Sequence, residues 1–283
     1  MNSLILLIKG IFIGIANIIP GVSGGTIALI MGIYEKFVNS ISHFLKNFKE
    51  NIKFLLPLLI GIALSMVLMS DVISFSFNKF PLATTLFFMG LVMGGVPFIS
   101  HKVVDKKNTS NWLIFIISFS IVISMIIIGN LGINSGSVSF DNMNIIGYIK
   151  LFIIGMISSA TMVIPGISGS LILMLIGYYY PVLELIKAFV HFKDLASNFI
   201  IILVLGLGVL MGIVLVSKII EKLFSKYENK TNYAIYGFIV ASIFAIPLAT
   251  FLKISYSINL IELLIGILIM IIGYIISYKL GEK

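Results

Sequence analysis

Two long apolar stretches of this chain are each interrupted by a Pro-Gly-x-Ser-Gly sequence, and no other feature limits the fold as strongly. The first stretch spans roughly residues 3–36 and contains "IPGVSGG" at 19–25, and the second spans 145–186 and contains "IPGISGS" at 164–170. Each stretch is too long for a single crossing, since a helix needs only about 20 apolar residues to cross a bilayer. Proline and glycine also interrupt a regular helix. We therefore predict two half-helices around a turn in each stretch, with the Pro-Gly-x-Ser-Gly break near its middle.

The rest of the chain predicts an all-α polytopic membrane protein in a single domain, 1–283. Hydrophobic residues make up 59% of the sequence and charged residues only 11%, where a soluble domain carries about 25% charged residues. Six further apolar stretches lie at roughly 54–71, 82–99, 112–129, 199–217, 233–252 and 259–278, separated by polar connectors that include 40–53, 72–81 and 218–232. There is no cysteine, the three histidines stand apart in polar connectors, and no P-loop is present. No metal site and no cofactor is therefore predicted.

The chain also repeats itself at an offset of 145 residues. At that offset Ile19-Pro20-Gly21 matches Ile164-Pro165-Gly166, Ser23-Gly24 matches Ser168-Gly169, and Tyr34 matches Tyr179. Glycines recur as well, in the pairs Gly10/Gly155, Gly32/Gly177 and Gly61/Gly206. An ungapped register over some fifty residues predicts two structural repeats, 1–130 and 145–283. Each repeat is predicted to be one broken hairpin followed by three helices.

The distribution of lysine separates two topologies. If both broken stretches are re-entrant hairpins, each half crosses the membrane three times, the halves are inverted, and 14 lysines lie on the side of the termini against 5 on the other. If both stretches cross the membrane, the split is 9 to 10. Because lysine and arginine are enriched on the cytoplasmic side, we predict re-entrant hairpins, an inverted repeat, six full spans, and cytoplasmic termini.

The residues at the two breaks favour an anion. Irregular backbone at membrane depth persists where it is buried in protein or lines a wet cavity, and inverted-repeat transporters bring such breaks together near the midplane. Ser23 and Ser168 stand where they could cap the second half-helix, and the backbone N–H groups there would point at a ligand. Thr26 and Ser170 add hydroxyls and Asn17 adds an amide. All nineteen cations are lysine, so an anion site here cannot use the bidentate fork of arginine. Tight helix packing by small residues is the alternative interpretation.

Few charged residues lie near the predicted spans. Glu35 and Lys36 follow the first hairpin, Glu184 lies in the outgoing arm of the second, and Glu262 lies one turn inside the last helix. Ionisable groups in spans are candidates for coupling or gating, although Glu35 and Lys36 also fit a cytoplasmic border. For Lys9 we favour a side chain that reaches the membrane surface.

Both motifs resemble the paired signatures of the PopT-type polyprenyl-phosphate transporter family. The similar segments are "GIANIIPGVSGGTIALIMGIYE" (14–35) and "MVIPGISGSLILMLIGYY" (162–179), and the resemblance extends over essentially the whole chain. It implies that undecaprenyl phosphate is returned from the outer to the inner leaflet of the bacterial cytoplasmic membrane. The implied partners are this lipid phosphate and the lipid bilayer, and no nucleic acid. It carries substrate-binding roles to Asn17, Gly21, Ser23, Gly24, Gly25, Thr26, Gly166, Ser168, Gly169 and Ser170. Nothing in the sequence indicates an oligomeric state.

Two other functions remain as alternatives. Undecaprenyl-diphosphate phosphatases are similar in their inverted re-entrant hairpins and PGxSRS-type motif, but Gly24 and Gly169 stand here in place of that arginine. Without arginine, stabilising a phosphoryl-transfer transition state is harder, so we predict a transporter rather than an enzyme. A carrier of a small soluble anion is the other alternative, because the motifs alone specify only an anion.

Overall fold

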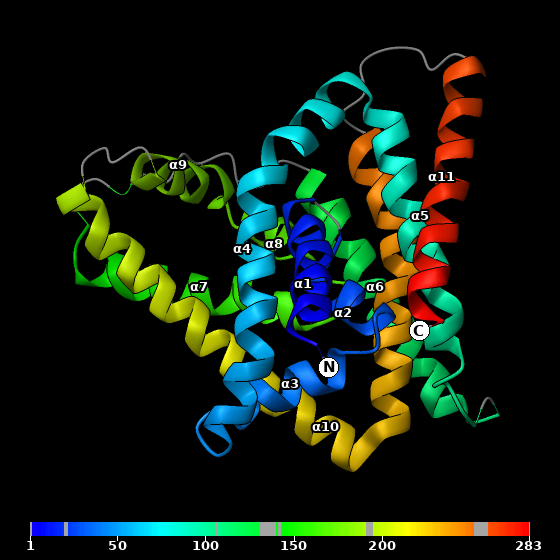
Figure 1. Ribbon diagram of the computed structural model, residues 1–283, viewed down its shortest axis with the longest axis horizontal. Coiled ribbons are helices and arrows are strands. Elements are labelled where there is room, and N and C mark those ends of the chain that lie inside the picture. Colours follow the sequence, from blue (N-terminus) through cyan, green and yellow to red (C-terminus); the bar gives the residue numbers. More distant parts are fainter. Residues whose placement is uncertain are drawn as a thin grey trace.

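The computed structural model describes residues 2–19, 22–105, 107–130, 140, 143–190, 195–251 and 260–282, and all regular structure in these ranges is helical. The fold class predicted from the sequence is thereby confirmed as all-α (Figure 1). The helices are α1 (Ser3–Ile18), α2 (Gly24–Ile30), α3 (Tyr34–Ser42), α4 (Phe48–Lys79), α5 (Pro81–Ser100), α6 (Thr109–Asn130), α7 (Ile145–Val163), α8 (Gly169–Leu175), α9 (Tyr179–Val190), α10 (Leu195–Phe251) and α11 (Leu260–Gly281).

Within the described ranges, six helices are long and apolar enough to cross a membrane. They are Phe48–Met69, Pro81–Ser100, Thr109–Ile128, Ile145–Val163, Asn198–Leu248 and Leu260–Gly281. Large apolar side chains on these helices point outward, and Leu260, Ile261 and Leu268 of α11 are 71%, 70% and 62% exposed. Such surfaces are unstable in water and stable against lipid. The chain is therefore a multi-pass membrane protein.

Helix α10 differs from the sequence prediction in one respect. The polar connector 218–232 does separate two helices, as predicted, but it does so through a kink at Tyr227, which has φ −138° and ψ 48°, and the residues on either side of the kink are helical (Figure 1). Helix α4 likewise continues through most of the predicted connector 72–81, as far as Lys79. Polarity marks where a helix leaves the hydrocarbon but not where it ends, because charged residues such as Lys and Glu are good helix formers in water.

The packing pattern of the first half recurs in the second. Helix α1 packs on α4 and α7 packs on the first part of α10, while α5 pairs with α11 and α6 with the second part of α10. The pairings in each half rest on glycines that allow close backbone approach: a Cβ atom on Gly10 would overlap the Leu58 carbonyl, and one on Gly155 would lie 2.7 Å from the Leu205 carbonyl oxygen. Small residues of this kind are the usual contact points of membrane helices. The inversion of the halves relative to the membrane stays a prediction.

The outgoing arm of each hairpin contains a second break that we did not predict. Gly32 and Gly177 have φ of +68° and +76°. After α2, Gly32 N–H donates to Leu29 O and Ile33 N–H to Ala28 O; after α8, Gly177 N–H donates to Met174 O and Tyr178 N–H to Leu173 O. Both are Schellman motifs, in which a left-handed glycine ends a helix. Each arm is therefore a seven-residue helix followed by a turn and another helix.

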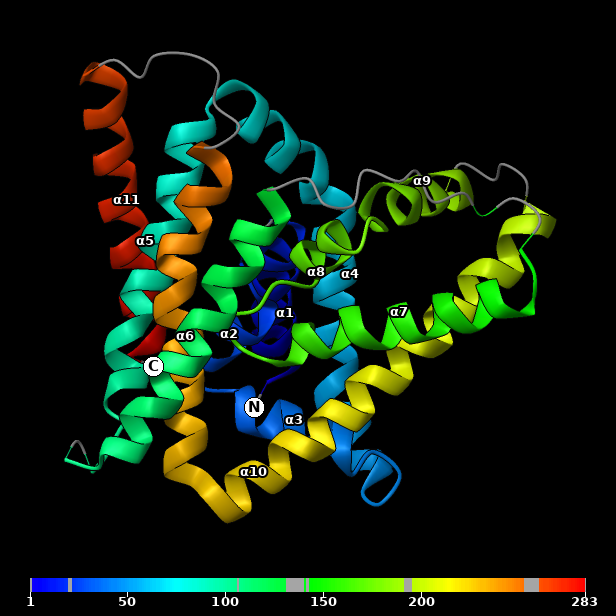
Figure 2. The ribbon, with the colours of Figure 1, turned by 180° about the vertical axis from the view of Figure 1, so that it is seen from behind.

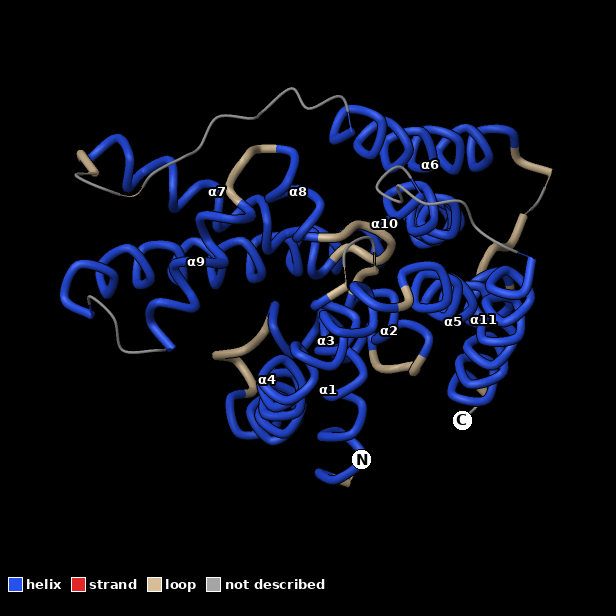
Figure 3. The backbone as a smooth tube through the Cα atoms, turned by 90° about the horizontal axis from the view of Figure 1, so that it is seen from above, coloured by secondary structure: helices blue, strands red, loops and turns tan. Residues whose placement is uncertain are grey.

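The first hairpin lies near the middle of the molecule. Seen from above, α1, α2 and α3 lie between the second hairpin (α7, α8 and α9) and the pair of α5 and α11 (Figure 3). Seen from the side, α7 runs across the long axes of α5, α6 and α11 rather than along them (Figures 1 and 2). This arrangement brings the first and second breaks together.

Candidate functional site

The two breaks form in similar ways at corresponding positions. Helix α1 ends at Ile18 and α2 begins at Gly24, and α7 ends at Val163 and α8 begins at Gly169. Pro20 and Gly21 lie outside the described residues, so the proposed role of Gly21 is not placed. At the second break Gly166 has φ +85°, and a Cβ atom there would lie 2.6 Å from the Phe238 carbonyl oxygen. Only glycine satisfies both conditions.

The first hairpin is hydrogen-bonded to the backbone of the second break. The Tyr34 hydroxyl donates to the Val163 carbonyl at 3.0 Å. The Ser23 hydroxyl donates to the Ile164 carbonyl at 3.1 Å, and the Gly166 N–H donates to the Thr26 hydroxyl at 2.8 Å. The last carbonyls of a helix have no partner within it, so the first hairpin completes the hydrogen bonding where α7 ends.

Gly25 allows this contact to be close. A Cβ atom on Gly25 would lie 2.9 Å from the Val163 carbonyl oxygen and 3.2 Å from that of Met162. Because real Cβ atoms do not approach to 2.9 Å, any side chain here would force the two breaks apart. Gly25 and Thr26 are both buried. The sequence-predicted residues Ser23, Gly25, Thr26 and Gly166 are thus brought together.

The first break, in contrast, has a bond of its own. The Asn17 side-chain oxygen accepts a hydrogen bond from the Gly24 N–H at 3.1 Å, so the end of α1 is tied to the start of α2. The residue that matches Asn17 in the second half is Met162, whose side chain has no comparable acceptor. The second break therefore cannot use this internal bond.

The predicted capping role of the two serines is wrong. Ser23 and Ser168 do occupy the N-cap positions of α2 and α8, but neither side chain makes a capping hydrogen bond. Ser23 is drawn across to Ile164, and the Ser168 hydroxyl instead meets the Ser170 hydroxyl at 2.8 Å. At the first break, the hydrogen bond from Ser23 to the second break therefore replaces the local capping bond.

The second break is richer in hydroxyl groups than the first. Ser168 is 4% exposed, and Ser170 is half-buried. Gly169 packs against α7, where its Cβ would lie 2.8 Å from the Ser158 carbonyl oxygen and 3.1 Å from the Thr161 hydroxyl. Sequence reasoning missed Ser158 and Thr161, although "SSAT" at 158–161 directly precedes the motif. Their matches in the first half are Ile13 and Ala16, so only the second break has hydroxyls on its incoming helix.

The two outgoing arms also differ in burial. Every residue of α2 except Leu29 is buried, whereas five of the seven residues of α8 are half-buried. Tyr34 is 2% exposed, but its match Tyr179 is half-buried. Sequence reasoning did not assign a role to Tyr34, and its recurrence at the repeat offset was the available signal. The second arm is therefore the more accessible of the two.

Lys9 lies inside the first hairpin rather than reaching the surface. Its ammonium group donates a hydrogen bond of 2.7 Å to the Met31 carbonyl, which is the C-cap of α2. A cation at a helix C-terminus interacts favourably with the helix dipole. The predicted surface orientation is wrong because this carbonyl, turned inward at the end of a seven-residue helix, is nearer.

The four candidate coupling or gating residues are not among the side chains that join the breaks. Glu35 forms an ion pair of 2.6 Å with Lys102, and the two side chains are 66% and 48% exposed. The Lys36 ammonium lies 5.1 Å from the centre of the Phe54 ring. Glu184 of α9 is exposed, and Glu262, in the first turn of α11, is half-buried. Their roles in coupling or gating stay predictions.

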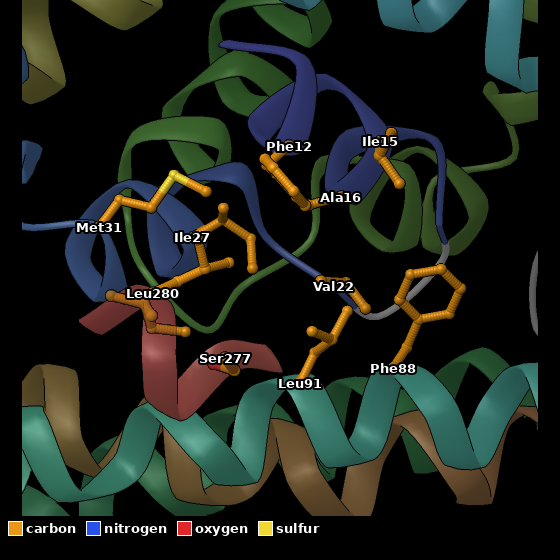
Figure 4. A pocket seen from close by; sticks show the side chains of 11 residues that line it. Phe12, Ile15, Ala16, Val22, Ile27, Met31, Phe88, Leu91, Ser277 and Leu280 are labelled. Atoms are coloured by element: carbon orange, nitrogen blue, oxygen red, sulfur yellow. The ribbon is translucent and has the colours of Figure 1, made fainter. Parts of the chain in front are cut away.

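An apolar pocket lies beside the first break (Figure 4). It encloses about 400 Å³, part of it open to the surroundings, between the first hairpin, α5 and α11. Val22 and Ile27 line it together with Phe12, Phe88 and Leu91, and Ser277 supplies its hydroxyl. A hydrocarbon surface of this kind does not suit a phosphate, so an anion fits the second break better than this pocket. Among the described residues, no group of three His, Asp or Glu side chains could hold a metal ion.

Comparisons with known proteins agree with the resemblance seen in the motifs. A model of the family described as undecaprenyl phosphate translocase-like matches residues 13–261. The polyprenyl-phosphate transporter of Staphylococcus aureus is 34% identical over 282 residues, which cover 98% of this chain and 95% of that protein. The polyprenyl-phosphate transporter of Vibrio cholerae is 31% identical over 258 residues, which cover 86% of this chain and 77% of that protein. No solved structure matches the fold.

Proposed function

Because the chain belongs to the undecaprenyl phosphate translocase-like family, we propose that it moves undecaprenyl phosphate across the bacterial cytoplasmic membrane from the outer to the inner leaflet. We further propose that the two Pro-Gly-x-Ser-Gly breaks hold the phosphate between them. The observation that carries this proposal is the direct contact of the two breaks, which come from opposite halves of the chain and meet through Ser23, Thr26 and Gly166.

The second break offers the chemistry that a phosphate needs. The Ser168 and Ser170 hydroxyls lie 2.8 Å apart and can both turn to donate to phosphate oxygens. The Gly166 N–H is a further donor, which at present is bonded to the Thr26 hydroxyl. Gly166 and Ser168 are buried, but Ser170 and four other residues of α8 are half-buried, and we infer that a phosphate approaches from this side. Hydroxyls and backbone N–H groups suit a chain that has no arginine.

The first break contributes the opposing wall. Asn17, Gly24 and Gly25 fix its shape, and Ser23 and Thr26 face the second break. Gly169 keeps the start of α8 close to α7, which fixes the direction of the Ser168 and Ser170 side chains. Gly21 keeps its proposed role from the family resemblance. The prenyl chain stays in the hydrocarbon, between the helices.

Transport in liposomes tests this proposal. Undecaprenyl phosphate with a labelled head group is distributed over both leaflets, and a membrane-impermeant phosphatase outside reports how much lipid it can reach over time. We expect the inner pool to become accessible with the wild-type protein. Ser23→Leu and Ser168→Leu should abolish this while leaving membrane insertion intact, because a bulky apolar side chain would fill the space between the breaks.

Ser225→Leu is the matched control, since Ser225 is an exposed residue of α10 whose hydroxyl bonds within its own helix. Transport at the wild-type rate by both break variants would exclude the assigned residues. An inner pool that stays protected from the phosphatase, with and without a proton gradient, would exclude the lipid substrate. Release of inorganic phosphate from undecaprenyl diphosphate by the purified protein would instead favour a phosphatase.

A further inference from the structure

The contact between the two breaks can be tested for symmetry, because the repeat register gives every residue a match 145 positions away. We replace each residue in a bond by its match in the other half. The bond from Ser23 to Ile164 then becomes one from Ser168 to Ile19. The bond from Tyr34 to Val163 becomes one from Tyr179 to Ile18. Donor side chains for both exchanged bonds are present. Four residues of the first hairpin make the contact, namely Ser23, Gly25, Thr26 and Tyr34. The matches of Ser23 and Tyr34 therefore allow the reciprocal contact.

The other two positions do not allow it. Thr26, which accepts from the Gly166 N–H, is matched by Leu171, which has no acceptor. Gly25, whose Cβ would lie 2.9 Å from the Val163 carbonyl oxygen, is matched by Ser170, which has a Cβ atom. In the exchanged arrangement one hydrogen bond is missing and one side chain overlaps a carbonyl. The observed contact is thus favoured over its mirror image for two independent reasons.

From this asymmetry we propose that Gly25 and Thr26 form a latch that works in one direction only: the first break closes over the second, and not the reverse. In the closed state the Thr26 hydroxyl accepts from the Gly166 N–H. The latch opens when a lipid phosphate takes the place of the Thr26 hydroxyl. The last step rests on the proposed function, but the latch itself does not. The Thr26 hydroxyl is an acceptor, as a phosphate oxygen is, so the exchange leaves the Gly166 N–H paired throughout. The Val163 and Ile164 carbonyls, once released from Tyr34 and Ser23, need other donors, and water can serve as one.

The latch also explains why burial differs between the two arms. The first arm is enclosed because three of its side chains are hydrogen-bonded to the second break. They are Tyr34 at the start of α3, and Ser23 and Thr26, which lie before and after Gly25. In the second arm, five of the seven residues of α8 are half-buried. The first break is the moving part in this arrangement, and the second break is the site that it covers.

Cysteine labelling tests the latch, since the natural chain has no cysteine. Val22→Cys places a single thiol next to Ser23, at a position that is 3% exposed. The Val22 side chain lines the apolar pocket beside the first break, so its rate of reaction with a maleimide in detergent reports how often the first break moves away from its neighbours. In this background, Thr26→Val removes the hydrogen bond with little change of shape, and Gly25→Ala adds the methyl group that the contact excludes.

We expect both variants to label roughly three to ten times faster than the parent, the factor given by one lost interhelical hydrogen bond. Thr26→Ser keeps the hydroxyl and should label at the parent rate. The matched changes in the second half, Leu171→Val and Ser170→Ala, should also leave the rate unchanged. A parallel reporter, Leu151→Cys, lies in α7 at 0% exposure in a core cluster with Leu185 and Ile201 that includes no residue of either break, and it should stay unreactive in every variant.

Parent-like labelling of both Thr26→Val and Gly25→Ala would overturn the latch, and so would equal acceleration by Leu171→Val. Faster labelling at Leu151→Cys in the same proportion would also count against it, because that result shows general loosening. Added undecaprenyl phosphate should speed labelling of Val22→Cys, and undecaprenol should not. If the variants behave as expected but the lipid phosphate has no effect, the latch stands and the proposed substrate fails.

Discussion

The two breaks share a motif but solve the same structural problem differently. In the first, Asn17 accepts from the Gly24 N–H, so one hairpin arm is tied to the other. In the second, the Val163 and Ile164 carbonyls and the Gly166 N–H are bonded to side chains of the first hairpin. The first break is self-sufficient and the second depends on a partner. A partner that can be withdrawn suits a site that must alternately bind and release a ligand.

The difference comes from three substitutions between the repeats. Asn17, Gly25 and Thr26 are matched by Met162, Ser170 and Leu171. The first set provides an internal acceptor, a surface without a side chain and a hydroxyl that reaches across. The second set provides none of these, but Ser170 adds a hydroxyl on α8. The same backbone has thereby acquired two roles, a cover and a covered site.

The largest effect should come from adding a methyl group to the second break. Gly166→Ala should destabilise the protein by about 3 kcal/mol or more, because a non-glycine residue at positive φ costs about 1–2 kcal/mol and the methyl group also overlaps the backbone at Phe238. Gly32→Ala is the comparison, since Gly32 has φ +68° but no atom within 4 Å of the added Cβ. It should cost about 1–2 kcal/mol. Thermal unfolding in detergent measures both, and equal losses would contradict the account of Gly166.

The next effect should separate the self-sufficient break from the dependent one. Asn17→Leu should destabilise the protein by about 1–3 kcal/mol, because the buried Gly24 N–H loses its acceptor. The matched change Met162→Leu should stay within about 1.5 kcal/mol, as volume-conserving apolar substitutions do. The two unfolding midpoints in detergent give the answer. An Asn17→Leu loss no larger than that of Met162→Leu, and within about 1 kcal/mol, would show that the first break does not depend on its internal bond.

A smaller effect should distinguish the two serines. Ser23→Ala leaves the Ile164 carbonyl without its donor and should cost about 1 kcal/mol of stability. Ser168→Ala removes only a bond between two hydroxyls and should change stability by less than about 0.5 kcal/mol while it weakens binding of undecaprenyl phosphate. Unfolding and lipid binding are measured on the same preparations. If the two variants lose stability equally, the proposed division of roles between the breaks is wrong.

The smallest effect should come from the charged residues at the ends of the arms. Glu35→Gln breaks the exposed ion pair with Lys102 and should change stability by less than about 1 kcal/mol. Glu184→Gln, on the exposed face of α9, should change it by no more. Transport assays on both variants sharpen the comparison, because a strong loss of transport with unchanged stability would identify that carboxylate as a coupling residue.

The sequence was sufficient for the helical class, the two breaks, and the residues Ser23, Gly25, Thr26 and Gly166 that meet there, but not for Tyr34. Those features follow from hydropathy, proline and glycine, which act locally. The sequence was not sufficient for the partners of Ser23, since a local N-cap and a bond to a carbonyl 141 positions away use the same hydroxyl. The turns at Gly32 and Gly177 were visible as a repeated glycine but not as a change of direction. The helical residues on either side of Tyr227 were missed because polarity was taken to indicate a loop.

The most direct test of the central claim compares both breaks in the presence of the same lipid. Ser170→Cys places a thiol at the half-buried second break, and Val22→Cys places one at the buried first break. Undecaprenyl phosphate should slow maleimide labelling at residue 170 and speed it at residue 22, with undecaprenol changing neither. Opposite responses to one ligand are expected if the phosphate occupies the second break and displaces the first. Unchanged labelling at residue 170 over a saturating range of lipid phosphate would contradict the account.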